Sequence, residues 1–170
     1  MMKRVIFALY AVMLFVASGC TVKYTLSGAS IPPDAKTFSV AYFPNNAPMV
    51  APILSATLTD ELTQRFATRT RLVQVPESGD FAFEGEIVGY TSTTSSVSSG
   101  DYALQNRLTI TVRVSFTNVV DDKASFKARS FSAYADYDST KLLTEVEGTL
   151  IPEIVDQLVT DIFMAAASNW

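Results

Sequence analysis

The sequence predicts an α+β fold, a two-layer sandwich in which two helices pack on one face of a mainly antiparallel sheet of four to five strands. In two segments the apolar residues recur every three to four positions, which is typical of amphipathic helices. Before and between these segments apolar and polar residues alternate, which is typical of half-buried strands. The order strand, helix, several strands, helix is that of two layers around one core.

The first half of the chain supplies a strand, a helix and a second short strand. Residues 37–43 are rich in β-forming types and end at a proline. Pro52 is tolerated in a first helical turn, and a four-residue repeat after it predicts a helix of about four turns. We expect the apolar stripe of this helix to be core: Leu54, Leu58, Leu62 and Phe66. Residues 71–75 then indicate a short strand.

The next predicted strand begins at Phe81, and its apolar face is interrupted by Gly85 and Gly89. Glycine inside a strand marks a bulge or the close approach of another segment. We expect that segment to be a helix packed tightly over the strand. Residues 91–100 are nearly all Ser and Thr, which leaves two alternatives, a mobile connection or a polar extension of the strand.

A regular alternation over residues 107–117 gives the clearest strand of the chain. Its apolar positions are Leu108, Ile110, Val112, Val114 and Phe116. Asp121 and its neighbours interrupt the pattern, and residues 124–135 return as a hairpin partner. A turn centred on Asp121 places Phe116 opposite Phe126 on the core side.

The same register predicts two arginines side by side on the polar face. Arg113 would lie opposite Arg129, and like charges directly opposite are destabilising. Glu84 or Glu86 on the neighbouring strand could compensate the pair, and so could an anionic ligand; we favour the glutamates. The phase of the apolar residues also slips in the second strand, which predicts a β-bulge near Arg129 and Ser130.

A second helix is predicted from Thr149 to the end of the chain, with Pro152 in its first turn. We expect it to cover the same sheet face as the first helix. Its apolar stripe is Ile151, Ile154, Val155, Leu158, Val159, Ile162 and Phe163.

The beginning of the chain has the order of a signal peptide. Two positive charges in MMKR precede the apolar residues 5–16, and the small residues Ala17, Ser18 and Gly19 follow. A membrane-spanning helix needs about 20 apolar residues, so we expect residues 1–19 to be removed. We therefore expect the mature chain to consist of a tether over residues 20–36 and a single α+β domain over residues 37–170.

Cys20 is the only cysteine and directly follows the small residues. The arrangement resembles a bacterial lipobox, in which the cysteine becomes the acylated N-terminus and carries chains such as palmitate. Stable anchoring takes more than one acyl chain, and a triacylated Cys20 meets that requirement. Thr21 rather than Asp follows, which favours the outer membrane of a Gram-negative cell. The alternative is an ordinary secretory cut beside a free thiol.

Composition excludes several function classes. After cleavage 11 basic residues face 17 acidic ones, a net charge of −6, which disfavours nucleic acid. Histidine is absent and no second cysteine exists, so no metal site, cofactor or catalytic residue is predicted. A hydrolase using carboxylates alone would need two that converge in a cleft. Glu84 and Glu86 on an open strand face do not form such a cleft, and we expect a protein without enzymatic activity.

Four stretches together resemble the LptE-type lipopolysaccharide-assembly lipoproteins of Bacteroidetes. They follow the lipobox and are spread along the mature chain from one end to the other: YTLSGASIPPDAKTFSVAYFPNNAP (24–48), GDFAFEGEIVGY (79–90), ALQNRLTITVRVSFTN (103–118) and LVTDIFMAAASNW (158–170). The resemblance implies two helices on a four-stranded sheet, which agrees with the reading of the residues.

The resemblance also implies a function. Such proteins plug the lumen of the outer-membrane β-barrel LptD, assist its assembly and help to deliver lipopolysaccharide to the cell surface. The chain would then be lipid-anchored, on the periplasmic side and in the barrel lumen. Basic residues on the sheet side are implied in lipopolysaccharide contact, and from position alone the candidates are Arg107, Arg113, Lys127 and Arg129. The alternative is a free-standing, periplasm-facing lipid or glycolipid carrier, which would need an enclosed apolar cavity.

Overall fold

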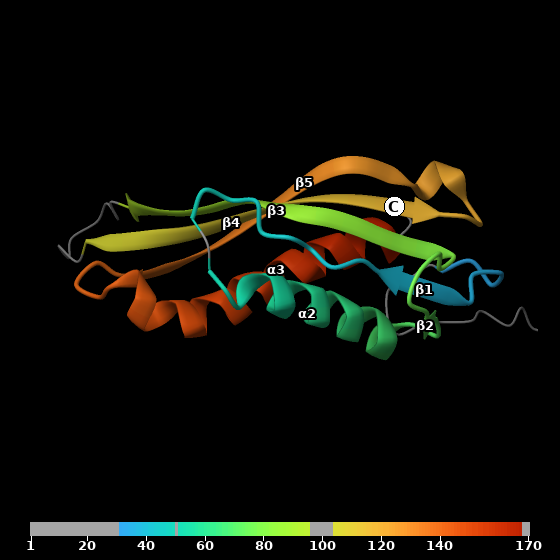
Figure 1. Cartoon of the computed structure of the whole chain (residues 1–170), viewed down its shortest axis with the longest axis horizontal. Helices are drawn as coiled ribbons and strands as arrows, with labels where there is room; N and C mark the ends of the chain where they lie inside the picture. Colours follow the sequence, from blue (N-terminus) through green and yellow to red (C-terminus); the bar gives the residue numbers. More distant parts are fainter. Residues whose placement is uncertain (1–30, 50, 96–103, 168–170) are drawn as a thin grey trace, which may run out of the picture.

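The computed structural model describes residues 31–49, 51–95 and 104–167, and in this part of the chain two helices lie on one face of a five-stranded sheet (Figure 1). This confirms the predicted fold class. The predicted signal peptide (1–19), Cys20 and the first part of the predicted tether lie outside the described residues. The elements are β1 (Thr37–Val40), α2 (Leu54–Arg69), β2 (Val73–Gln74), β3 (Phe81–Ser95), β4 (Gln105–Asn118), the 3₁₀ turn η1 (Asp122–Ala124), β5 (Phe126–Asp138) and α3 (Leu143–Ala167).

The sheet is mixed, with the strand order β2-β1-β3-β4-β5. The short strand β1 runs parallel to both of its neighbours, β2 and β3. Most of the pairing belongs to the long antiparallel ladders β3–β4 and β4–β5. Of the predicted Ser/Thr tract, residues 91–95 extend β3 as a polar strand, and residues 96–100 lie outside the described residues.

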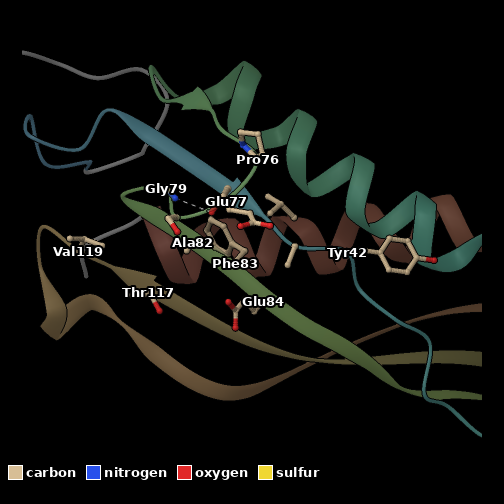
Figure 2. A pocket seen from close by; sticks show the side chains of 13 residues that line it. Tyr42, Pro76, Glu77, Gly79, Ala82, Phe83, Glu84, Thr117 and Val119 are labelled. Atoms are coloured by element: carbon tan, nitrogen blue, oxygen red, sulfur yellow. Dashed lines mark hydrogen bonds between the residues drawn. The ribbon is translucent and has the colours of Figure 1, made fainter.

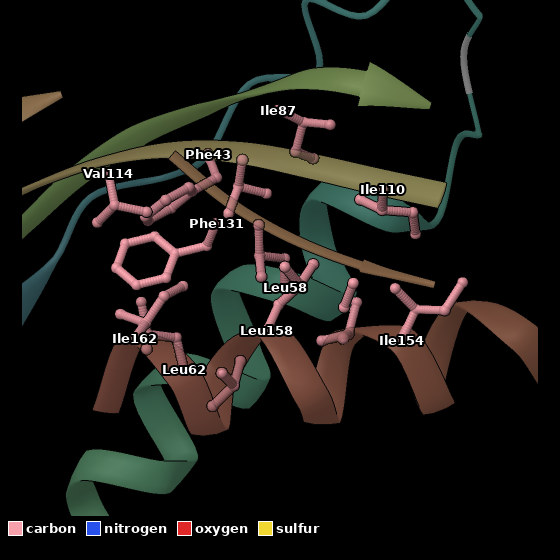
Figure 3. Close-up of a cluster of buried hydrophobic side chains, with 14 of the residues drawn as sticks. Phe43, Leu58, Leu62, Ile87, Ile110, Val114, Phe131, Ile154, Leu158 and Ile162 are labelled. Carbon is pink, nitrogen blue, oxygen red and sulfur yellow. The ribbon is translucent and has the colours of Figure 1, made fainter. Parts of the chain in front are cut away.

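The core lies between the sheet and the two helices, and it confirms both predicted apolar stripes. The four stripe residues of α2 are fully buried. Figure 3 shows Leu58 and Leu62 of α2 beside Leu158 and Ile162 of α3, facing the sheet. Packing of one helix face, rather than helix propensity, therefore fixes where both helices lie.

Helix α3 begins at Leu143, about two turns earlier than predicted, so Pro152 lies inside the helix and not in its first turn. The extra turns add only two partly buried apolar residues to the stripe, Leu143 and Val146, so the apolar pattern is weaker there than from Leu150 onward. The Glu145 carboxylate accepts a hydrogen bond from the Leu142 N–H at 3.1 Å, as the third helical residue does in a capping box. The Tyr90 hydroxyl donates to Glu147 at 3.0 Å, which ties the first turns to the sheet.

The hairpin register confirms one predicted pair and corrects another. Phe116 lies opposite Phe126, as predicted. Arg113 lies opposite Ser130, and the predicted pair with Arg129 is wrong. The reason is a β-bulge in β5. The sequence predicted this bulge near Arg129 and Ser130, and in the structure it lies just before Arg129. It places one extra residue in β5 between Phe126 and Arg129, where Ala128 adopts a φ of 50°.

The close approach predicted at Gly85 is made by a loop and not by a helix. A Cβ on Gly85 would lie 2.5 Å from Cε1 of Phe43 and 2.4 Å from the Arg113 carbonyl oxygen. Phe43 belongs to the segment after β1, which continues along β3 and bonds the Ile87 N–H through the Pro44 carbonyl at 2.9 Å. The other glycine, Gly89, marks a bulge in β3.

The Gly85→Ala substitution is therefore expected to destabilise the fold by about 2 kcal/mol, because the methyl group must displace either backbone or the buried Phe43 ring. The matched control is Gly148→Ala in α3, where a Cβ meets nothing within 4 Å. Alanine there should stabilise by up to about 1 kcal/mol. Urea unfolding of both variants measures the two changes, and equal effects would refute the close approach.

Candidate interaction face

The face of the sheet turned away from the helices is polar, and we call its β3–β5 portion the open face. Because opposite residues of antiparallel strands share a face, the register assigns its members. None of the following is buried. They are Glu84, Glu86, Thr91 and Thr93 of β3, Arg107, Thr109, Thr111, Arg113, Ser115 and Thr117 of β4, and Ser130, Ser132, Tyr134, Asp136 and Asp138 of β5.

Arg107 is held on the open face by two neighbours from β5. Its Nε and Nη2 donate to the two carboxylate oxygens of Asp136 at 2.7 and 2.8 Å. Its guanidinium also lies 3.7 Å from the centre of the Tyr134 ring. The hydrogen bonds from Arg107 hold the pKa of the Asp136 carboxyl below its usual value. The Arg107 guanidinium is thus held by a bidentate ion pair with Asp136 and by a cation–π contact with the Tyr134 ring.

Arg113, near the other end of the same strand, pairs with Glu86 of β3 at 2.9 Å. Glu86 in turn accepts a hydrogen bond from the Asn46 side chain at 2.7 Å. Of the two compensating glutamates considered from the sequence, Glu86 is therefore the one in contact. Its partner is a single arginine, since the bulge removes Arg129 from this row.

Lys127 and Arg129 lie at the bulge, apart from the other two candidates. Arg129 lies opposite Val114, whose side chain belongs to the core, and its guanidinium stands 5.1 Å from the Phe131 ring and 5.7 Å from the Phe126 ring. Both cations are exposed. Within the described part of the chain neither forms an ion pair with a carboxylate. The four predicted cations therefore do not form one patch: Arg107 and Arg113 lie at separate places on β4, and Lys127 and Arg129 lie at the bulge of β5.

Sequence reasoning missed Tyr134 and Asp136, the partners of Arg107. The predicted strand, residues 124–135, contained Tyr134 and ended one residue before Asp136, whereas β5 continues to Asp138 and carries both on its polar side. The sequence pattern did not contain the register that puts Asp136 opposite Arg107. That register depends on the bulge, which a pattern of apolar residues locates only approximately.

A hollow of about 700 Å³ lies at one border of the open face, beside β1 and the start of β3 (Figure 2). Pro76, Glu77 and Gly79 line it from the loop before β3, and Glu84 and Thr117 line it from the sheet. Two of its lining residues are carboxylates and none is basic. The hollow therefore disfavours phosphate and other anions.

The loop around this hollow is fixed by side-chain hydrogen bonds. The Gly79 N–H donates to Ser39 Oγ at 3.1 Å. The Asp80 carboxylate accepts from the N–H groups of Lys36 and Thr37 at 2.8 and 2.9 Å. The Lys36 bond, followed by the Thr37 bonds, holds the pKa of the Asp80 carboxyl below its usual value. The start of β1 and the start of β3 are thereby tied together.

No group of three or more His, Cys, Asp or Glu side chains in the described ranges is arranged to hold a metal ion. No helix among these residues is both long enough and apolar enough to cross a membrane.

Comparison with known proteins gives one family. The model of the family described as "LptE: Lipopolysaccharide-assembly" matches residues 35–166. No curated protein gives a significant match.

Two solved structures are similar to this chain at low sequence identity. A hypothetical protein from Chlamydia trachomatis is 12% identical with a TM-score of 0.53, and the match covers 79% of this chain and 99% of that one. A minor lipoprotein from Acinetobacter baumannii is 15% identical with a TM-score of 0.48, covering 78% and 94% of the two chains. The first of these supports the fold alone.

Proposed function

The chain belongs to the LptE family of lipopolysaccharide-assembly proteins, and from this premise we propose that it is the lipoprotein partner of an LptD-type outer-membrane β-barrel. In this role it occupies the barrel lumen, assists barrel assembly and helps to place lipopolysaccharide at the cell surface. The observation that carries the proposal is the family match over residues 35–166, which includes every helix and strand except the last residue of α3.

The open face supports the lumen position. Barrel lumens are polar and hydrated, and this face carries hydroxyl groups between ion pairs that are already satisfied, Arg107 with Asp136 and Arg113 with Glu86. Such a surface can lie against a wet wall, because the two arginines keep their carboxylate partners and the remaining carboxylates, Glu84 and Asp138, stay in contact with water. The role needs no catalytic residue, and the proposal is of a protein without enzymatic activity.

The anchor is part of the same proposal and rests on the sequence. Residues 1–19 are removed as a signal peptide, and Cys20 becomes the acylated N-terminus. Residues 20–36 then link the lipid to the domain at 37–170, on the periplasmic side of the outer membrane. The membrane attachment lies in the acyl chains, whose burial contributes about 0.8 kcal/mol per CH₂.

Among the four candidate cations, the geometry favours Lys127 and Arg129 for contact with lipopolysaccharide. The charges of Arg107 and Arg113 are compensated within the chain, and recruiting them for a phosphate would break their ion pairs. Lys127 and Arg129 are exposed, and the rings of Phe126 and Phe131 steady the Arg129 guanidinium. The carrier alternative gains no support from the hollow of Figure 2, which is open and acidic.

The test is a pulldown of the lipidated chain, tagged after Trp170, from outer membranes in mild detergent. We expect a single very large barrel protein at near-equal stoichiometry. The control is Cys20→Ala, which removes the proposed acylation site and should reach the outer membrane fraction in strongly reduced amount. Intact, lipidated wild-type chain without a barrel would contradict the proposal.

A further inference from the structure

The hollow of Figure 2 is lined by two carboxylates that have no cationic partner in the described chain. Glu77 comes from the loop before β3, and Glu84 comes from the open face of β3, so the two negative charges lie on different walls. Within the described ranges neither forms an ion pair with lysine or arginine. By contrast, Glu86, two residues further along β3, is paired with Arg113. A negative potential therefore remains in the hollow, and a cation is the ligand that suits it.

Two exposed apolar side chains also border the hollow. Val119 is 71% exposed and Tyr42 is 64% exposed. Figure 2 shows Val119 at the left and Tyr42 at the right, with the two glutamates between them. An aromatic ring and an aliphatic side chain beside carboxylates suit the apolar stem and charged head of lysine or arginine. A bare inorganic cation would leave both apolar side chains uncovered.

The hollow is a fixed part of the fold. A Cβ on Gly79 would lie 2.6 Å from the backbone carbonyl carbon of Phe38, so the loop can lie this close to β1 only with glycine there. The Asp80 carbonyl accepts a hydrogen bond from the Val119 N–H at 2.9 Å, which ties the end of β4 to the same loop. Both walls are thus in place before a ligand binds, and little ordering of the chain opposes binding.

The shape of the hollow favours a cation that is carried by a partner protein. Sites for free small molecules enclose most of the ligand surface, whereas this hollow, of about 700 Å³, is open toward the sheet face that carries Glu84 and Thr117. A side chain that projects from a partner needs such an open side. We propose that the hollow receives a lysine or arginine side chain of the barrel protein, in place of the water that otherwise meets Glu84. This inference rests on the proposed function and adds the chemistry of one contact.

Cross-linking from inside the hollow tests the contact. The lipidated, full-length chain carries photoreactive benzoylphenylalanine in place of Tyr42, which keeps an aromatic ring at the border. It is irradiated in outer membranes, and the linked peptide is sequenced by mass spectrometry. We expect a cross-link to the barrel protein at a residue directly beside a lysine or arginine. Glu77→Gln with Glu84→Gln should lower the yield by about tenfold, while the barrel still copurifies through the rest of its interface.

The matched control is Glu153→Gln with Asp161→Asn, which removes two exposed carboxylates from α3 and gives the same net charge. Its cross-link yield should stay within about twofold of that of the parent chain. All four side chains are exposed, so both double variants should unfold at the same urea concentration as the wild-type chain.

Several results would overturn the inference and leave the proposed function intact. With the barrel copurifying, these are no cross-link from position 42, equal yields from the two double variants, a linked site without a neighbouring basic residue, and a cross-link to lipopolysaccharide. If no barrel copurifies with the wild-type chain, the proposed function and this inference both fail.

Discussion

Replacing Phe66 by alanine is expected to lower the free energy of unfolding by about 4 kcal/mol. The Phe66 ring is fully buried on α2 and contacts both the sheet and the second helix. Its centroid lies 4.6 Å from that of Phe83 in the sheet and 5.0 Å from that of Phe163 in α3. Truncation leaves a cavity bounded by both helices and the sheet, which no single element can move to fill.

Equilibrium unfolding in urea measures the change. Phe66→Leu fills most of the space and should lose markedly less, which keeps the test valid if the alanine variant does not fold. Gln64→Ala, exposed on the same helix, should change stability by less than about 0.5 kcal/mol. A loss for Phe66→Ala no larger than that of Gln64→Ala would show that the ring does not join the two layers.

The central parts of the fold could be predicted because each is set by a local period. The four-residue repeat ending at Phe66 gave α2, and the two-residue alternation through Val112 gave β4, since burial of one face fixes both. The start of α3 could not be predicted in this way. Its first two turns are held by Glu145 and Glu147, which bond a backbone N–H and the Tyr90 hydroxyl and contribute no apolar period.

The sequence predicts which residues lie on the open face. It does not predict which of these residues form ion pairs with one another. The polar side of β4, with Arg107 and Arg113, follows from alternation. Which carboxylate meets each arginine follows from registers across two strands. The register between β4 and β5 depends on the bulge at Ala128. This is a non-glycine residue with positive φ, and no turn motif in the sequence predicts that conformation. A one-residue shift moved Arg129 to the other side of the sheet and separated the expected pair of arginines.

Neutralising Lys127 and Arg129 together is expected to weaken lipopolysaccharide binding by about tenfold or more, a loss of about 1.4 kcal/mol. The reason is that both cations are exposed and free of carboxylate partners in the described chain, so a phosphate can meet them without breaking an existing ion pair. The variant is Lys127→Gln with Arg129→Gln. Binding of purified lipopolysaccharide to the detergent-solubilised chain measures the change at two salt concentrations, since exposed charges are screened by salt.

The matched control is Arg107→Gln with Arg113→Gln. It also removes two positive charges, but from the open face. Because Asp136 and Glu86 already compensate these arginines, binding should change by less than about twofold. Equal losses in the two double variants would mean that the ligand responds only to net charge, which is already negative in this protein. A loss confined to the control would place the contact on the open face after all, with the ligand displacing the two carboxylates. A loss confined to Lys127 and Arg129 would place lipopolysaccharide at the bulge of β5.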